Sequence, residues 1–243
     1  MEIYVVQRED TVDGIATVYG VSPEDIIFIN QLVYPYPLAV GQALLIPDGT
    51  AAGLERPSVL SCGYAYPFIQ EPVLRETLPY LSQLYVFSYG FTPEGELLPP
   101  AQDESWMIEQ ASWFGSAAIL TLTPLGADGR FSNELITAVV NNPAAKQQLF
   151  QNLLSVVEQK GYQGVDVDFE YIKAEDRDAF TGFVAELTET MNARGYQVTV
   201  ALAPKTSRDQ QGLLYQGKDY AGLGAAANRV LLMTYEWGYT YYR

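Results

Sequence analysis

The sequence predicts an α/β protein in two parts, a small β-α-α-β domain at residues 1–47 and a larger α/β domain at residues 58–243. Three observations predict this division. The first 47 residues read as strand, helix, helix and strand. Residues 48–57, "DGTAAGLERP", have the composition of a linker. The rest of the chain alternates strands with helices, which predicts a parallel sheet with helices outside it, in the order of a TIM-type barrel.

The composition restricts the chemistry. The 243 residues carry 29 acidic and 14 basic side chains, a formal charge of −15, which disfavours nucleic acids and anionic membranes as partners. There is no histidine, so the usual zinc sites and Ser-His-Asp catalysis are excluded and no cofactor is expected. We therefore expect carboxylates to carry any acid–base work. No signal peptide and no apolar run of membrane-spanning length is visible, so neither export by such a signal nor a membrane span is expected.

The small domain is predicted from its helix ends. Asp10 or Thr11 caps a first helix that Gly20 ends, and Ser22 followed by Pro23 begins a second one. The four elements are expected at residues 3–7, 10–20, 22–30 and 42–47.

The stretch "YVVQREDTVDGIATVYGVSPEDIIFINQL", closed by "VGQALLIP", resembles the LysM module. The resemblance implies binding of glycans that contain N-acetylglucosamine, in a groove between the loop before the first helix and the loop after the second. The loop residues carried over are Asp10, Thr11, Val12, Asn30, Gln31 and Leu32. Glu9 stands where the family usually has glycine. The alternative is that Asp10 merely caps a helix and Asn30 merely ends one.

The larger domain begins after the linker. Its six strands are expected at residues 58–66, 83–91, 117–125, 162–172, 196–204 and 228–237. Its helices are expected at residues 72–82, 104–115, 133–141, 144–161, 176–195 and 219–227.

The fourth strand, "YQGVDVDFEYI", places an acid at every second position: Asp166, Asp168 and Glu170. Alternate residues of a strand share a face, so the three acids form one row and the apolar residues between them form the other. In a barrel the apolar row packs outward on helices while the acids point inward, and Glu170 falls at the C-terminal end, where barrel enzymes place their active sites. Carboxylates this close in a partly dry interior do not all ionise, so one holds a proton near neutral pH.

"GVDVDFE" resembles the core of the D-x-x-D-x-D-x-E signature of glycoside hydrolase family 18, and "LMTYEWGY" resembles the segment that ends its sixth strand. The resemblance implies that Glu170 protonates the glycosidic oxygen and that Asp168 orients the acetamido group of the substrate, whose carbonyl oxygen attacks the anomeric carbon. It implies that Asp166 shares a proton with Asp168 and that Tyr235 hydrogen-bonds the acetamido oxygen. No protein nucleophile is needed in this scheme.

Further substrate contacts are expected from the ends of the strands. These candidates are Tyr64, Tyr66, Tyr89, Met233, Glu236 and Trp237. Each aromatic residue has ordinary packing as its alternative role. Gln163 replaces the first Asp of the signature, and Glu236 stands where chitinases carry Asp. The family barrel has eight strands, whereas this sequence ends just after the sixth, so the barrel is expected to be truncated.

The resulting hypothesis is a retaining glycoside hydrolase that cleaves N-acetylglucosamine linkages in peptidoglycan, located at the bacterial spore cortex or coat or at the cell wall. Its partner is peptidoglycan or a chitin-like glycan that contains N-acetylglucosamine, with LysM as the anchor. Within the family, residues 203–241 resemble the spore-cortex-lytic N-acetylglucosaminidases. The alternative is a non-hydrolytic glycan-binding protein with a truncated barrel. A chitin-binding, lectin-like member of the fold is disfavoured because Glu170 is present. Open sheet edges predict self-association.

Overall fold

The computed structural model describes residues 2–47, 59–207 and 209–235. The chain divides into two compact units, residues 1–59 and 60–243. The predicted linker, residues 48–57, and the candidate site residues Glu236 and Trp237 lie outside the described residues.

The first unit is the predicted β-α-α-β domain. Its elements are β1 (Glu2–Val5), α1 (Val12–Tyr19), α2 (Pro23–Ile29) and β2 (Ala43–Ile46), and β1 pairs antiparallel with β2. Thr11 caps α1 by accepting a hydrogen bond from the Gly14 N–H, and Gly20 ends this helix at φ 65°, so the helix-end prediction is confirmed. A separate apolar core fills the unit, built from Val6, Val12, Ile15, Ala16, Ile26, Leu44 and Ile46.

The second unit is built on a sheet of six parallel strands, as predicted. They are β3 (Cys62–Ala65), β4 (Gln83–Phe91), β6 (Ala117–Leu122), β7 (Gly164–Val167), β8 (Gln197–Leu202) and β9 (Arg229–Leu232), paired in that order. A short β5 (Leu97–Leu98) adds an antiparallel partner to β4. Among the described residues β3 and β9 are the two ends of this parallel order, so the sheet is an open part of a barrel.

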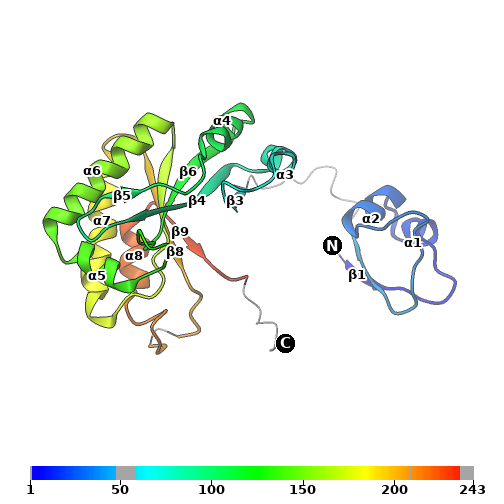
Figure 1. Ribbon diagram of the computed structural model, residues 1–243. Coiled ribbons are helices and arrows are strands. Elements are labelled where there is room, and N and C mark those ends of the chain that lie inside the picture. Colours follow the sequence, from blue (N-terminus) through cyan, green and yellow to red (C-terminus); the bar gives the residue numbers. More distant parts are fainter. Residues whose placement is uncertain (1, 48–58, 208, 236–243) are drawn as a thin grey trace. The chain divides into compact units, whose positions relative to one another are not determined.

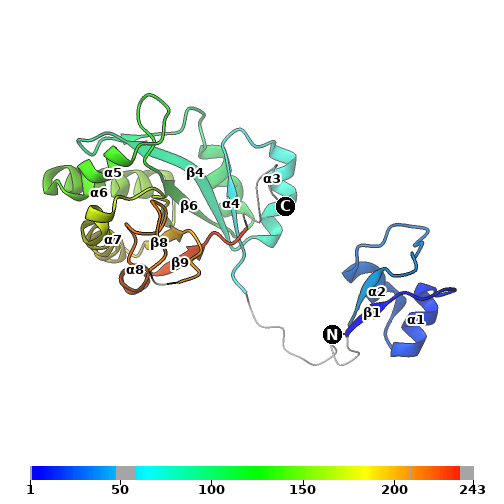
Figure 2. The same ribbon diagram turned by 90° about the horizontal axis from the view of Figure 1, so that it is seen from below.

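Helices cover the outer face of this curved sheet (Figure 1 and Figure 2). They are α3 (Glu71–Thr77), α4 (Ser105–Trp113), α5 (Asn133–Val140), α6 (Pro143–Lys160), α7 (Arg177–Asn192) and α8 (Tyr220–Ala226), with short 3-10 turns η2 (Leu78–Tyr80) and η3 (Ala174–Asp176). In the described part of the chain, none of the helices combines the length and the apolar character that a membrane span requires.

The alternation of side chains in β7 divides the two faces as expected. Val165 and Val167 are fully buried in the core between sheet and helices, and Phe169 continues this row against Phe180 and Phe183 of α7. The opposite face of β7 carries Asp166. The apolar row thus anchors the strand in the core and fixes the direction of the acids.

Candidate active site

The acidic row lies where parallel barrels place their chemistry. Asp166 is the third residue of β7, and Asp168 and Glu170 follow directly after the strand, at its C-terminal end. Asp166 is fully buried, and its Oδ2 accepts a hydrogen bond of 2.8 Å from the Tyr64 hydroxyl on β3. Its neighbours in register are Thr121 on β6 and Thr199 on β8. The first acid is therefore held inside the sheet, while the next two reach its rim.

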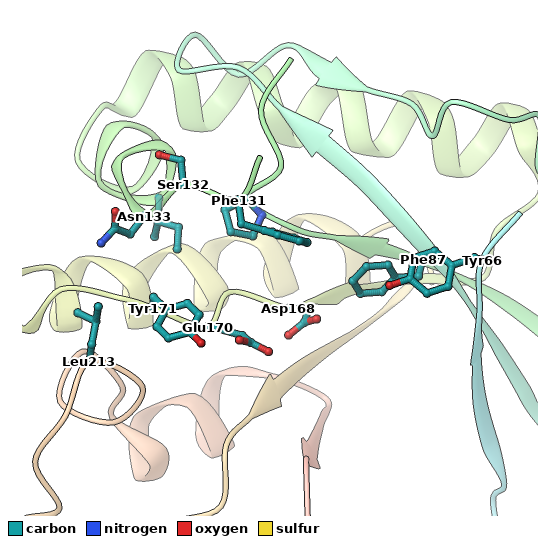
Figure 3. Close-up of a pocket in the computed structure, with 11 residues that line it drawn as sticks. Tyr66, Phe87, Phe131, Ser132, Asn133, Asp168, Glu170, Tyr171 and Leu213 are labelled. Carbon is teal, nitrogen blue, oxygen red and sulfur yellow. The ribbon is translucent and has the colours of Figure 1, made fainter. Parts of the chain in front are cut away.

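Two cavities meet at this rim. The larger, about 470 Å³, is lined by both Asp168 and Glu170, and the smaller, about 320 Å³, by Asp168 but not Glu170. Figure 3 shows the two carboxylates in the middle of the larger cavity, with Tyr66 and Phe87 toward one end and Ser132, Asn133 and Leu213 toward the other. The acids thus face a space that a sugar ring can enter.

Burial sets the ionisation of these acids. It raises the pKa of Asp168 to about 6, with the charge of Glu170 acting in the same direction and that of Lys218 opposing it. Burial and the neighbouring Asp168 also raise the pKa of Asp166 well above its ordinary value, against the effect of the Tyr64 hydrogen bond. Asp166 therefore holds a proton in conditions where an exposed aspartate has lost it.

Lys218 is a site residue that the sequence reasoning missed. Its side chain is fully buried, and its pKa is lowered to about 8 by burial, against the opposing charges of Asp168 and Glu170. A single lysine in the loop between β8 and α8 gives no periodic or motif signal, so only the folded arrangement places it beside the acids.

The structure also gathers four of the other candidates. Tyr66, Met233 and Tyr235 line the smaller cavity together with Tyr64 and Asp168. Tyr66 is half exposed and stacks on Phe68, with 4.8 Å between the ring centroids. Gln163 is exposed just before β7, at the opposite end of the strand from Glu170.

The prediction that Tyr89 contacts substrate is wrong. Tyr89 is 2% exposed and lies in the core between sheet and helices, where its hydroxyl donates to Glu104. A register irregularity between Phe87 and Tyr89 explains this. It shifts the alternation by one residue, so that Phe87 faces the cavity whereas Tyr89 points to the helices.

Asn30 and Asp10, the candidate sugar-binding residues of the first unit, form hydrogen bonds within that domain. Asn30 donates to the carbonyls of Ile26 and Leu45, both at 2.9 Å, and accepts from the Leu45 N–H at 2.7 Å. Asp10 accepts from the Tyr4 hydroxyl and the Gln7 N–H. For Asn30 this favours the structural alternative, because both ends of its amide are used within the domain.

A curved parallel sheet with an acidic row at the C-terminal end of a central strand has the architecture of barrel glycosidases. Residues 121–240 match the family model "Glycosyl hydrolases family 18", and residues 4–47 match the LysM domain. The chain therefore carries a glycosyl hydrolase family 18 domain at residues 121–240 and a LysM domain at residues 4–47.

Among curated proteins, the chain is 34% identical over 237 residues to YdhD of Bacillus subtilis (strain 168), a match that covers 97% of this chain and 54% of YdhD. It is 29% identical over 290 residues to the "Cortical fragment-lytic enzyme" of the same organism, covering 99% of this chain and 67% of that protein. The crystal structure of the Bacillus cereus spore cortex-lytic enzyme SleL matches with a TM-score of 0.73 at 28% identity, covering 98% of this chain and 54% of that one. The chain thus spans about half the length of YdhD and of SleL.

Proposed function

We propose that the chain is a glycoside hydrolase that cleaves N-acetylglucosamine linkages in peptidoglycan by a retaining, substrate-assisted mechanism. One observation carries the proposal: Asp168 and Glu170 line the same cavity at the C-terminal end of β7, with the buried Asp166 behind them. The names of the relatives, which refer to cortical fragments and to the spore cortex, support the spore cortex as the source of the glycan.

The proposed reaction uses the substrate as its own nucleophile. Glu170 gives its proton to the glycosidic oxygen while the acetamido carbonyl oxygen attacks the anomeric carbon, so the glycosidic bond breaks as an oxazolinium ring closes. Asp168 accepts a hydrogen bond from the acetamido N–H, and the hydroxyl of Tyr235 donates to the acetamido oxygen. Glu170, now ionised, then takes a proton from the water that opens the ring.

The ionisation of Asp168 fits this role. An oxazolinium ion is positively charged, and an ionised carboxylate beside it stabilises that charge. Because the pKa of Asp168 is raised to about 6, its carboxyl group is mostly ionised at neutral pH and loses this form below about pH 6. We expect turnover to fall on the acidic side as Asp168 takes up its proton.

The decisive experiment measures release of reducing ends from purified cortex fragments. Glu170→Gln removes the proton donor but keeps the shape, and we expect a loss of roughly 10²- to 10⁴-fold in turnover. Glu186→Gln is a matched control, because Glu186 lies on α7 in an ion pair with Lys146.

A thiazoline analogue of N-acetylglucosamine tests the substrate-assisted step and is expected to inhibit. Glycans without the N-acetyl group should not be cleaved. Substantial turnover by Glu170→Gln, or equal rates on acetylated and deacetylated glycans, would contradict the mechanism. Glycan binding with no turnover by the unmodified chain would favour the non-hydrolytic alternative.

The LysM domain is proposed to hold the enzyme on its glycan. Since the chain carries a formal charge of −15, attachment should depend on neutral sugar contacts and persist in moderate salt. Pull-down of the full chain with insoluble peptidoglycan at rising salt concentration tests this, and release by moderate salt would contradict it. Self-association through β3 and β9 stays a prediction, which light scattering of the 243-residue chain checks.

A further inference from the structure

Five buried side-chain atoms of the described residues have no hydrogen-bond partner among the protein atoms, and all belong to the barrel unit. They are Thr121 Oγ1, Asp166 Oδ1, Asp168 Oδ1, Arg177 Nε and Lys218 Nζ. Unpaired polar atoms cost free energy in a protein interior, and an unpaired charge costs more. Burial of Lys218 without a hydrogen-bond partner therefore lowers the stability of the fold, and its position needs an explanation.

The fold fixes Lys218 firmly. The preceding Gly217 packs so closely on the loop after β7 that a Cβ at position 217 would lie 2.2 Å from the carbonyl oxygen of Ile172. The following Asp219 forms an ion pair of 3.3 Å with Arg177, at the start of α7. Both neighbours of Lys218 are thus tied to the segment that follows the acidic row, so the lysine cannot move away from it without breaking these contacts.

Lys218 faces groups of both signs. Asp168 and Glu170 favour its charged form, and Lys205, which follows β8, disfavours it. The pKa of Asp168 in turn is raised by the charge of Glu170 and lowered by that of Lys218. The charge of Asp168 also raises the pKa of Asp166 and that of Tyr64 on β3. No ion pair within 4.0 Å involves Lys218 in the described part of the chain, so its ammonium group acts on the acids through space and not in a direct ion pair.

Lys218 is fully buried, whereas Asp168 and Glu170 line the cavities. Lys218 lines neither of these two cavities, so it acts on the reaction through the acids. We propose that Lys218 is a positioning residue whose buried ammonium group stabilises the ionised form of Asp168, and thereby keeps Asp168 able to accept the acetamido N–H at neutral pH. The effect on turnover rests on the proposed function, whereas the effect on Asp168 does not.

The test is a carboxyl ¹³C NMR titration of the full chain. In Lys218→Met, which keeps the length of the side chain but removes the charge, the pKa of Asp168 should rise by about 1 unit, since a nearby opposite charge favours ionisation. Lys146→Met, which removes a lysine that pairs with Glu186 on α7, should leave it unchanged. An unchanged Asp168 midpoint in folded Lys218→Met would overturn the proposal.

A reciprocal measurement covers the case in which Lys218→Met fails to fold. Linkage requires that Asp168→Asn lower the pKa of Lys218 below its value of about 8 in the unmodified chain, which a ¹⁵N titration of the ammonium group measures. An unchanged Lys218 midpoint would also overturn the proposal. If turnover is measurable, the acid limb of kcat/KM should move to higher pH in Lys218→Met. A carboxyl shift without turnover in any variant would instead reject the proposed function and leave the electrostatic coupling in place.

Discussion

The polar side chains at the candidate sites of the two units differ in their hydrogen bonding. In the LysM domain, Asn30 has both ends of its amide paired, and Asp10 accepts two hydrogen bonds. In the barrel, Asp166, Asp168 and Lys218 each keep a buried atom without a partner among the described residues. Asn30 and Asp10 hold the LysM fold together, whereas the unpaired atoms at the barrel site cost stability.

This difference separates structural from functional polar residues without reference to any family. A satisfied buried group contributes to stability, and its loss is felt as unfolding. An unsatisfied group at a cavity lowers stability, and the fold retains it because it serves binding or catalysis. Strained or unpaired groups cluster at active sites for this reason.

The largest expected effect is on the stability of the LysM domain. Asn30→Ala removes three hydrogen bonds, which at about 1 kcal/mol each gives a loss of about 3 kcal/mol in the free energy of unfolding of this unit. Hydrogen exchange of peptides from residues 2–47, measured in the full chain, reports that loss. Arg8→Ala, at an exposed position of the same domain, is the control and should change little. Unchanged protection combined with lost glycan binding would make Asn30 a sugar contact and break the comparison.

In the barrel, the buried Asp166 is expected to destabilise the folded state as pH rises, whereas Asn30 stabilises the LysM domain. The raised pKa of Asp166 means that the native chain keeps a proton that the unfolded chain releases near pH 4. The contribution of Asp166 to stability therefore falls by about 1.4 kcal/mol per pH unit from about pH 4 up to its native pKa. In Asp166→Asn this part of the slope should be absent.

The unmodified chain and Asp166→Asn are compared by the slope of the free energy of unfolding against pH. The absolute stability is not compared, because the new amide also needs hydrogen-bond partners and changes it. Tryptophan fluorescence isolates the barrel, since Trp106, Trp113 and Trp237 all follow residue 60. Parallel stability curves for the two proteins between pH 4 and 6 would show that Asp166 is not a buried, proton-holding acid.

Patterns within single strands and helices explain which parts of the fold and of the site could be predicted from the sequence. Period-two alternation placed Asp166, Asp168 and Glu170 on one face of a strand, and helix caps at Thr11 and Ser22 gave the element ends of the LysM domain. These are local signals, and the structure agrees with the helix caps and with the direction of Asp166. The expected strand 162–172 is shorter in the structure, so Asp168 and Glu170 follow β7 instead of lying within it. The six parallel strands followed from the alternation of elements.

Tyr89 and Lys218 show what such signals miss. A register irregularity reverses the faces of β4 after Phe87, and no composition rule marks its position in "VFSYGF". Lys218 belongs to the site only because Gly217 packs against a loop more than forty residues earlier in the chain. Long-range packing therefore decides which isolated polar residues join a site, and a pattern within one strand cannot report it.

The smallest expected effect concerns Glu9, which stands where LysM modules usually carry glycine. Glu9 has φ 73°, a left-handed conformation that costs a residue with a Cβ about 1–2 kcal/mol and costs glycine little. Glycine also makes the unfolded chain more flexible, at a cost of about 0.5–1 kcal/mol, so Glu9→Gly should stabilise the domain by about 0.5–1 kcal/mol. The neighbouring Arg8 is not among the residues with positive φ, so Arg8→Gly should destabilise by a similar amount. Opposite changes in hydrogen exchange for two adjacent glycine substitutions would assign the effect to backbone strain, and a loss of protection in both would show that Glu9 is held by contacts that outweigh it.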